Sequence, residues 1–545
     1  MTGKELVLKA IRCERVEREP WVPFVGCHAA HLIGRAADEF LTSEADIVAG
    51  VQKGIDLYKP DGVPVIFDLQ IEAEILGCSM MWSPDNPPAV ASHPLADGVT
   101  LDQLSIPGPG DGRLKIALAA TRRLRKANPD IALYGLITGP FTLALHLQGT
   151  DIFLQMFDDP NHVQKTMDFG RRVAQSMAGY YLDAGVDVVA VVDPMTSQIG
   201  PHQFEQFVTP HLKSIFDHIR DRKGLSSLFV CGHAQKNIEV MCNTNPDNIS
   251  IDENIALDYV RDLCLPRNIS FGGNLQLTTV LLLGSPRDAQ RHALECLKIG
   301  GTKGFILSPG CDLPYATPPA NIESVTKLLH DPYEREVVET LVDTEVPDDT
   351  LDMSDYGNSE KVIVDIITLD SEGCAPCQYM VEAVKSIAPH FEGIVEWREH
   401  KIKNPEALTF MGAFFVKNIP TICIDGRIAF VSQIPARNQM IEAVQNRIFE
   451  KLRTRIQQHK GVIYLIGDER DEAYQRLKDN TLLAMLELGA DIDVELREVT
   501  DPAHFEGFGV LPEQTPVAIT ANFSMKSAGK DVPTPIIKEW LKSLT

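Results

Sequence analysis

The stretch GFILSPGCDLP, at Gly304–Pro314, decides the fold of the first part of the chain when it is read with LFVCGH at Leu228–His233. Each stretch is a short apolar run, typical of a buried β-strand, that stops at a cysteine: Cys311 in one and Cys231 in the other. A barrel of parallel strands places the C-terminal ends of all its strands on one face. Two cysteines that lie far apart in the sequence are therefore predicted to meet at that face.

Apolar runs alternate with longer helical patterns from about residue 20 to residue 330, which is typical of repeated β-α units. The sequence predicts eight strands: Val22–Cys27, Gly62–Phe67, Ala132–Thr138, Val186–Val192, Ser227–Cys231, Asn248–Asp252, Ile269–Asn274 and Gly304–Leu307. This pattern favours an α/β (β/α)8 TIM barrel. The alternative is a doubly wound open sheet, but its first strand is usually followed by a glycine-rich phosphate turn, which GCHAA at 26–30 is not.

Polar residues follow most of the predicted strands and would line the mouth of the barrel. They are Cys27, His28, Asp68, Asp193, Cys231, His233, Asp252, Glu253, Asn274 and Cys311. We assign catalytic roles to Asp68 and Asp193 and substrate binding to His28, Asp252 and Asn274. Each carboxylate alone can instead cap a helix, and for Asp193 that interpretation is equally good. The two cysteines also have a plainer interpretation, as small buried apolar side chains.

Length and composition limit the classes of protein to consider. A chain of 545 residues is expected to form two or three domains. The formal net charge of −24 excludes a strongly basic surface, so we expect neither a nucleic-acid nor an anionic-membrane partner. No secretory leader or long apolar segment is evident, and 11 mostly scattered cysteines are unlike a secreted disulfide framework, so a soluble cytoplasmic protein is expected. Formation of a homodimer is left as an open alternative.

The sequence of the last third of the chain predicts a repeated α/β unit. The predicted boundaries are a barrel at 1–335, an acidic linker at 336–360, a first α/β domain at 361–455 and a second at 456–545. The order strand, helix, strand, X-Pro strand and helix occurs in both α/β domains. The second copy has Asp468–Asp471 where the first copy has CAPC at Cys374–Cys377, so we expect no redox chemistry in the second copy.

The Cys374 and Cys377 pair lies between a predicted strand and a predicted helix. A helix N-terminus lowers the pKa of the first thiol, so Cys374 is predicted to attack disulfides and Cys377 to resolve the mixed disulfide. Half of a zinc site is the alternative, but the chain has no second C-x-x-C. Residues 361–455 resemble a thioredoxin or glutaredoxin domain. The resemblance implies that Pro420, after Ile419, is the cis-proline that faces the cysteine pair and its substrate.

The barrel resembles the uroporphyrinogen decarboxylase superfamily over most of residues 1–330. TGKELVLKAI at 2–11 with Arg18-Glu19-Pro20 is similar to the start of that family, and Val65–Asp68 resembles the strand that carries its catalytic aspartate. True decarboxylases use N-terminal arginines to hold substrate carboxylates. The corresponding segment Gly26–Arg35 keeps one arginine, so the resemblance does not extend to porphyrinogen decarboxylation.

The methyltransferase branch, which includes methylcobalamin:coenzyme M methyltransferases, is the better match. Its zinc motif is His-x-Cys with a distant Cys, and SPGCDLP at 308–314 is the most specific part of the resemblance. The motif implies zinc bound by Cys231 and Cys311. Phe229 stands where the histidine is expected, so His233 is predicted to be the third ligand. The other candidates for that ligand are His28 and His31.

This resemblance implies a corrinoid-dependent methyltransferase with a fused thiol-disulfide module. A zinc-bound thiol is deprotonated yet nucleophilic, and it would take a methyl group from a Co(III) corrinoid and release Co(I). The implied partners are a methylated corrinoid or corrinoid protein and a small thiol acceptor. Two alternatives stay open: a non-catalytic or corrinoid-binding barrel with a working redox domain, and a divergent tetrapyrrole decarboxylase that keeps Asp68 central.

Overall fold

The chain forms two compact units, the first over Met1–Thr344 with Glu372–Ala375 and the second over Glu345–Ser371 and Pro376–Thr545. The structure, a computed structural model, describes residues 1–340, 356, 361–372, 374–402, 404–414, 416, 418–456, 461–489, 492, 494–520 and 524–544. Most of the predicted linker at 336–360 lies outside these residues. Its first part is helical, because α16 (Pro332–Thr340) extends into it.

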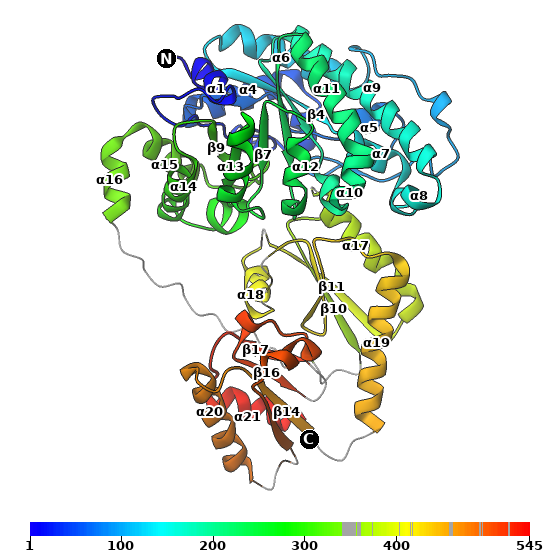
Figure 1. The fold of residues 1–545 in the computed structure, drawn as a ribbon, viewed down its shortest axis with the longest axis vertical. Helices are drawn as coiled ribbons and strands as arrows, with labels where there is room; N and C mark the ends of the chain where they lie inside the picture. The colour runs from blue at the N-terminus through cyan, green and yellow to red at the C-terminus, as the bar shows by residue number, and fades with distance from the viewer. Residues whose placement is uncertain are drawn as a thin grey trace. The chain divides into compact units, whose positions relative to one another are not determined.

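A parallel sheet of seven strands forms the centre of the first unit, with helices packed around its outside (Figure 1). Its order is β1-β4-β5-β6-β7-β8-β9. The strands are β1 (Gly62–Pro64), β4 (Ala132–Thr138), β5 (Val188–Val192), β6 (Leu225–Val230), β7 (Asn248–Ile251), β8 (Ser270–Leu275) and β9 (Phe305–Pro309). Seven of the eight predicted strands are therefore present, in chain order around the sheet. A two-stranded ribbon, β2 (Met80–Met81) with β3 (Ala89–Val90), lies apart from it.

Residues 20–22 close this sheet into a ring by bonding to both of its edge strands. On one side, Val22 N donates to Leu307 O at 3.0 Å and Leu307 N donates to Pro20 O at 2.9 Å. On the other side, Asp61 N donates to Trp21 O at 2.8 Å. Prolines at 20 and 23 bracket the segment and cannot donate backbone hydrogen bonds, so the pairing is confined to this short piece. The prediction of a full strand over Val22–Cys27 is wrong for that reason.

Helices follow the strands and cover the outside of the ring. They are α1 (Gly3–Ile11), α2 (His28–Leu32), α3 (Ala37–Leu41), α4 (Glu44–Tyr58), α5 (Ile71–Ile75), α6 (Leu114–Ala127), α7 (Pro140–Gln148), α8 (Ile152–Asp158), α9 (Pro160–Ala184), α10 (Pro201–Gln203), α11 (Thr209–Asp221), α12 (Ile238–Cys242), α13 (Leu257–Cys264), α14 (Pro286–Gly300) and α15 (Pro319–His330). Many begin as their sequences predict: Asp159 caps α9, and Thr2 and Ser285 form capping boxes with the third residue of α1 and α14.

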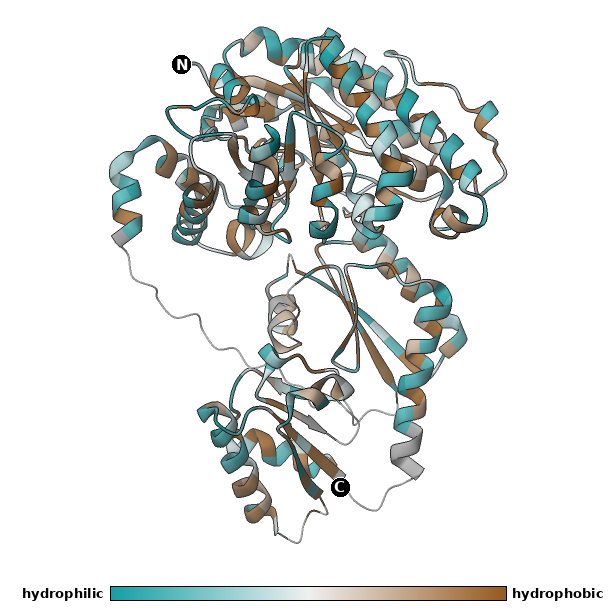
Figure 2. Cartoon of the chain, in the orientation of Figure 1, coloured by the Kyte–Doolittle hydropathy of each residue, from teal (hydrophilic) through white to brown (hydrophobic). Residues whose placement is uncertain are grey.

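The second unit contains two four-stranded sheets of identical topology. Their orders are β11-β10-β12-β13 and β15-β14-β16-β17; in each, the first two strands are parallel and the other neighbours are antiparallel. The strands are β10 (Val362–Thr368), β11 (Val395–Lys401), β12 (Thr421–Ile424), β13 (Arg427–Val431), β14 (Gly461–Ile466), β15 (Val494–Val499), β16 (Val517–Thr520) and β17 (Met525–Ala528). The central strands β10 and β14 are mainly apolar (Figure 2). The repeat seen in the sequence is thus a repeat of topology.

Helices and proline turns complete the two copies. The helices are α17 (Ala375–Ile387), α18 (Pro405–Ala413), α19 (Arg437–Ile456), α20 (Glu472–Leu488) and α21 (Thr534–Lys542). The peptide bonds before Pro420 and Pro516 are both cis, each shortly before the third strand of its sheet. In the second copy the Asp471 carboxylate caps α20 by accepting from Ala473 N at 2.8 Å, at the place where the cysteine pair precedes α17 in the first copy.

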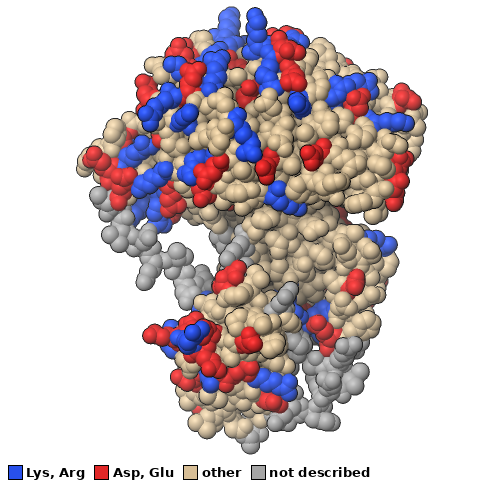
Figure 3. Space-filling model, in the orientation of Figure 1, with Lys and Arg blue, Asp and Glu red and all other residues tan. Residues whose placement is uncertain are grey.

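Charged side chains of both signs are mixed over the visible face of the first unit (Figure 3). Exposed ion pairs of this unit include Arg123 with Glu44 and Arg222 with Asp183. This face carries no continuous basic surface of the kind that binds nucleic acid. Among the helices that the structure describes, none is long and apolar enough to cross a membrane.

Candidate active site at the mouth of the barrel

Cys231 and Cys311 meet at the C-terminal end of the barrel strands. Cys231 directly follows β6, and Cys311 follows β9 after one glycine. The Cys231 thiol donates a hydrogen bond to the Cys311 sulfur, with the two Sγ atoms 3.1 Å apart. Both side chains are half-buried. The mouth therefore presents two thiols side by side, within reach of a small molecule.

Three phenylalanines form an aromatic floor beneath the thiol pair. The ring centroids of Phe24 and Phe229 are 5.3 Å apart, and Phe67 lies 6.0 Å from Phe24 and 5.9 Å from Phe229. Cys231 and Cys311 pack against the hydrophobic cluster that contains these rings. Phe229, which takes the place of the expected histidine, is only 2% exposed. The Phe229 side chain therefore packs inside the barrel.

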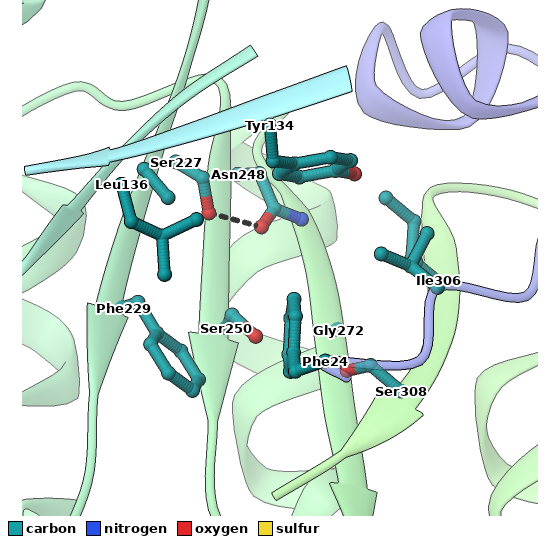
Figure 4. A pocket seen from close by; sticks show the side chains of 12 residues that line it. Phe24, Tyr134, Leu136, Ser227, Phe229, Asn248, Ser250, Gly272, Ile306 and Ser308 are labelled. Atoms are coloured by element: carbon teal, nitrogen blue, oxygen red, sulfur yellow. Dashed lines mark hydrogen bonds between the residues drawn. The ribbon is translucent and has the colours of Figure 1, made fainter. Parts of the chain in front are cut away.

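A small cavity lies inside the barrel, next to this floor (Figure 4). Its walls are mostly apolar, with polar side chains from β6, β7 and β9. The lining residues include Tyr134, Ser227, Asn248, Ser250, Phe229 and Ser308. Ser227 Oγ donates to Asn248 Oδ1 at 2.8 Å, and Asn248 Nδ2 donates to Ser270 Oγ at 2.9 Å. Ser227 and Asn248 therefore have hydrogen-bond partners within the protein.

Asp252 and Glu253 lie next to the loops that carry the two cysteines. Asp252 Oδ2 accepts from Gly232 N at 2.5 Å, directly after Cys231. Glu253 is half-buried next to Gly310: a Cβ atom on that glycine would lie 2.2 Å from Glu253 Oε2, which is itself buried. Burial, with the Asp252 carboxylate nearby, raises the pKa of Glu253 to about 8. Gly310 is thus required because a carboxylate fills the space beside it.

Asp312 has the corresponding position on the other side of Cys311. A Cβ atom on Gly26 would lie 1.9 Å from Asp312 Oδ1, and Cys27 N donates to Oδ2 at 3.3 Å. Burial raises the pKa of Asp312 well above its usual value. Among the described residues, Asp312 Oδ1 and Glu253 Oε2 are both buried without a hydrogen-bond partner. The sequence placed Asp312 inside the cysteine motif but gave no sign that Gly26 makes room for it.

Zinc, which the resemblance implies, is short of ligands here. Two thiols are suitable donors, but a catalytic zinc takes three protein ligands. Within the part of the chain that the structure describes, no three His, Cys, Asp or Glu side chains gather in a way that could hold a metal ion. His233 is exposed, and no other histidine replaces it beside the pair. The side chains as they stand do not fit a three-ligand zinc site.

Asp68 is neutralised by Arg113. The two side chains form a buried ion pair through Arg113 Nη1, and Arg113 Nε also donates to Glu74 Oε2 at 2.6 Å. Gln70 N donates to Asp68 Oδ1 at 2.9 Å. Both oxygens of Asp68 therefore have partners within the protein. The catalytic role of Asp68 stays a prediction, for a carboxylate that is paired with Arg113.

Asp193 caps a helix. Its Oδ1 accepts from Thr142 N at 2.7 Å and from Thr142 Oγ1 at 2.6 Å, and Oδ2 accepts from Phe141 N at 3.2 Å. These groups belong to the first turn of α7, which follows β4. The capping interpretation of Asp193 is therefore the correct one, although the helix is not the one that follows Pro194. The catalytic role of Asp193 stays a prediction from the sequence.

His28 and Asn274 also bond within the protein. His28 Nε2 lies 2.6 Å from Tyr58 Oη and its Nδ1 lies 3.0 Å from Tyr315 O, and burial lowers its pKa to about 4. Asn274 Nδ2 donates to Asp252 O at 3.1 Å and to Ile255 O at 2.8 Å. These polar atoms are bonded within the protein, and substrate binding by His28 and Asn274 stays a prediction from the sequence.

A second thiol site lies in the first of the two α/β repeats, at residues 361–455. Cys374 and Cys377 form a disulfide, and Cys374 directly precedes α17. Cys374 is half-exposed, whereas Cys377 is 1% exposed. The first sulfur is thus the one that an external thiol can reach.

The ring of parallel strands and its cysteine motif define a family. The Uroporphyrinogen decarboxylase (URO-D) family matches residues 2–332, so the chain belongs to this family. Among curated relatives, the Methylcobamide:CoM methyltransferase MtbA of Methanosarcina acetivorans is 26% identical over 333 residues, which are 60% of this chain and 97% of the relative. A Uroporphyrinogen decarboxylase of Synechococcus sp. is 24% identical over 336 residues, 58% of this chain and 94% of the relative.

A solved methyltransferase structure from Methanosarcina mazei has the same fold in the barrel. Its TM-score is 0.57 at 22% identity, with 61% of this chain and 99% of that chain covered. The chain is thus an enzyme of the methyltransferase and decarboxylase family, with its family domain in the barrel.

Proposed function

We propose that the barrel transfers a methyl group from a methylated corrinoid, free or bound to a partner protein, to the sulfur of a small thiol. The observation that carries the proposal is the convergence of Cys231 and Cys311 at the barrel mouth. Relatives named methylcobamide:CoM methyltransferases support this choice, as does a second kind of relative, the methylated-thiol–coenzyme M methyltransferase of Methanosarcina mazei, which is 26% identical over 295 residues.

The proposed reaction is a nucleophilic displacement at the methyl carbon. The acceptor sulfur forms a new S–C bond while the Co–C bond breaks, the electron pair stays on cobalt as Co(I), and the thiol proton passes to solvent. The contribution of the chain is to orient the two reactants, which alone lowers the barrier substantially. The thiol pair lies above an apolar floor that excludes water from one side.

Decarboxylation of a tetrapyrrole is the weaker candidate. Such chemistry needs a carboxylate free to bind the substrate, whereas Asp68 is enclosed with Arg113 and is only 2% exposed. We therefore keep methyl transfer as the proposal for the barrel.

Zinc held by Cys231, His233 and Cys311 stays a prediction from the sequence. Its support is the donor chemistry of the two thiols. It also requires His233 to leave the surface and point toward them, and no part of the proposed displacement depends on it.

For residues 361–455 we propose a thioredoxin-like thiol-disulfide oxidoreductase. Its support is the disulfide between Cys374 and Cys377 at the start of α17, the cis peptide before Pro420 and the strand order β11-β10-β12-β13. Residues 456–545 are proposed to be a copy without redox chemistry, since Asp471 caps the helix there.

The test is anaerobic transfer from methylcobalamin to a small thiol such as coenzyme M, followed by the appearance of Co(I) in the visible spectrum. The full chain, with thiols reduced, is compared with Cys311→Ser and with Cys242→Ser, a matched control at a buried cysteine in α12. We expect about a hundredfold loss in Cys311→Ser, because the mouth then orients the reactants less well, and near-normal rates in the control. Full activity of Cys311→Ser would refute the role of the pair.

A further inference from the structure

The two mouth cysteines are closer than a shared metal would hold them. Two sulfur ligands of one tetrahedral zinc, each at about 2.3 Å, are about 3.8 Å apart. The Sγ atoms of Cys231 and Cys311 are 3.1 Å apart and joined by a thiol hydrogen bond. A disulfide needs about 2.05 Å. The pair therefore lies between the spacing of zinc ligands and that of a disulfide.

Among the described residues, the surroundings of the pair also lack a third metal ligand. The position two residues before Cys231 holds Phe229, fixed between Phe24 and Phe67, and His233 is exposed. Among the described residues, no third ligand side chain gathers with the thiols. Two neighbouring thiols that are accessible and have no third ligand have what thiol-disulfide exchange requires.

We propose that Cys231 and Cys311 form a reversible redox pair, a second thiol-disulfide exchange site of this chain in addition to Cys374 and Cys377. This inference goes beyond the proposed methyl transfer and does not depend on it. Its reactants are small-molecule disulfides in one direction and dithiols in the other.

The exchange proceeds in two balanced steps. Cys311, which accepts the hydrogen bond from Cys231, attacks one sulfur of a disulfide RSSR; a Cys311–SR bond forms and RS⁻ leaves with the proton of the Cys311 thiol. Cys231 then attacks the Cys311 sulfur, the Cys231–Cys311 disulfide forms, and the second RS⁻ leaves with the remaining proton. Two thiols are oxidised by two electrons and RSSR is reduced to two RSH. A dithiol reverses both steps.

The structure supplies an internal control for this proposal. Cys242 and Cys264 also form a close thiol pair, with their Sγ atoms 3.8 Å apart, but both are buried between α12 and α13. Proximity is thus present at both pairs, and half-exposure only at the mouth. A small disulfide is expected to oxidise the mouth pair and to leave the buried pair reduced.

The experiment uses the full chain with Cys374→Ser and Cys377→Ser, which removes the other reactive pair. The reduced, metal-free protein is treated with oxidised glutathione under native conditions. Remaining thiols are then alkylated, and the protein is digested without reductant for mass spectrometry. We expect a peptide pair linked through Cys231 and Cys311, which dithiothreitol removes, and alkylated Cys242 and Cys264. In Cys231→Ser we expect instead a stable mixed disulfide of glutathione at Cys311.

Two results would overturn the proposal: absence of the linked peptide while the mouth thiols are still alkylated, or capping of both cysteines by glutathione without a link. Circular dichroism before and after oxidation shows whether the chain stays folded. The readout is covalent, so it is independent of methyl transfer. A linked pair in a protein that transfers no methyl group would refute only the proposed function, and methyl transfer without a linked pair would refute only the redox pair.

Discussion

The Phe229 ring packs against the Phe24 ring at a centroid distance of 5.3 Å, directly below the cysteine that follows it two residues later. In the methyltransferases that the barrel resembles, a histidine ligand is expected at this position. Because Phe229 is held in the aromatic floor, the side chains next to it at the mouth are two thiols with carboxylates around them.

Phe229→His is predicted to convert the thiol pair into a zinc site. The imidazole would supply the third ligand that the described residues lack, and we expect zinc to bind at least tenfold more tightly than in the natural chain. Loss of the aromatic contacts and burial of a polar ring are expected to cost about 1–3 kcal/mol in the free energy of unfolding. Zinc titration against a chromophoric chelator measures the affinity.

Phe229→Leu is the matched control for that substitution, since it removes the ring without adding a ligand. It is expected to reduce stability while leaving zinc affinity unchanged. Equal zinc affinity in all three proteins would contradict the interpretation of Phe229 as the missing ligand position.

Removal of Arg113 is predicted to destabilise the barrel strongly. Arg113→Met leaves the carboxylate of Asp68 buried without its cation, which is expected to cost about 3–5 kcal/mol. The double variant Asp68→Asn/Arg113→Met should recover part of this loss because the fully buried charge is gone, and only Glu74, whose side chain is 31% exposed, loses its cation. Urea unfolding of the two variants measures the difference. Equal stability of both would show that the ion pair does not hold this part of the mouth.

The sequence predicted the positions of the strands well, but it did not predict the extent of the first one. The predicted strand Ala132–Thr138 coincides with β4, because a continuous apolar run marks a strand buried on both faces. The first predicted strand failed because Pro23 ends the pairing of residues 20–22, an effect that apolar runs alone do not reveal. A proline can thus shorten a strand, although the shortened segment keeps its place in the ring.

The candidate site was predictable only in part. Strand ends brought Cys231 and Cys311 to one point, as parallel topology requires. The polar residues Asp68, Asp193, His28 and Asn274 were expected at the mouth, yet their oxygens and nitrogens are taken up by partners on other segments. Arg113, for example, lies just before α6, away from any strand end. No local sequence pattern predicts such long-range pairing. The sequence alone therefore could not separate positioning residues from reactive ones.

The stability of the barrel is predicted to fall as pH rises from about 4.5 to about 7 because of Glu72. This side chain is 1% exposed, and burial raises its pKa from 4.5 to about 7. The folded state then holds a proton that the unfolded state has lost, so the stabilisation is complete below the unfolded pKa and lost as pH rises through the folded one. The change is expected to reach at most about 3 kcal/mol.

Glu72→Gln is the control, since its amide oxygen still accepts from Thr138 N, and the Thr138 hydroxyl can donate to Leu69 O. Thermal or urea unfolding at several pH values should give a smaller slope for Glu72→Gln than for the natural chain. Parallel pH profiles for the two proteins would exclude Glu72 as the source.

The half-exposed Cys374 is predicted to be the attacking thiol of the first α/β repeat. A disulfide-containing substrate protein should be trapped as a mixed disulfide in Cys377→Ser, in which no resolving thiol follows, and should not be trapped in Cys374→Ser. Non-reducing electrophoresis detects the adduct. Trapping confined to Cys374→Ser would reverse the two roles.

The last prediction is that the reduced Cys374 and Cys377 pair re-reduces the mouth pair of its own chain. A dithiol and a disulfide on one chain meet at an effective concentration set by the tether, commonly in the millimolar range for short flexible linkers. Protein oxidised at Cys231 and Cys311 should therefore recover its mouth thiols, after limited reduction of the Cys374 and Cys377 disulfide, at a rate independent of protein concentration.

The matched comparison mixes two full-length variants, one with Cys374→Ser/Cys377→Ser and an oxidised mouth, the other with Cys231→Ser/Cys311→Ser and a reduced Cys374 and Cys377 pair. Recovery in this mixture should be slower at low concentration and should rise in proportion to it, because the two pairs are then on different chains. Quantifying the disulfide-linked peptide against time at two protein concentrations measures both rates. Equal rates in the intact chain and in the mixture would mean that the two thiol sites work independently.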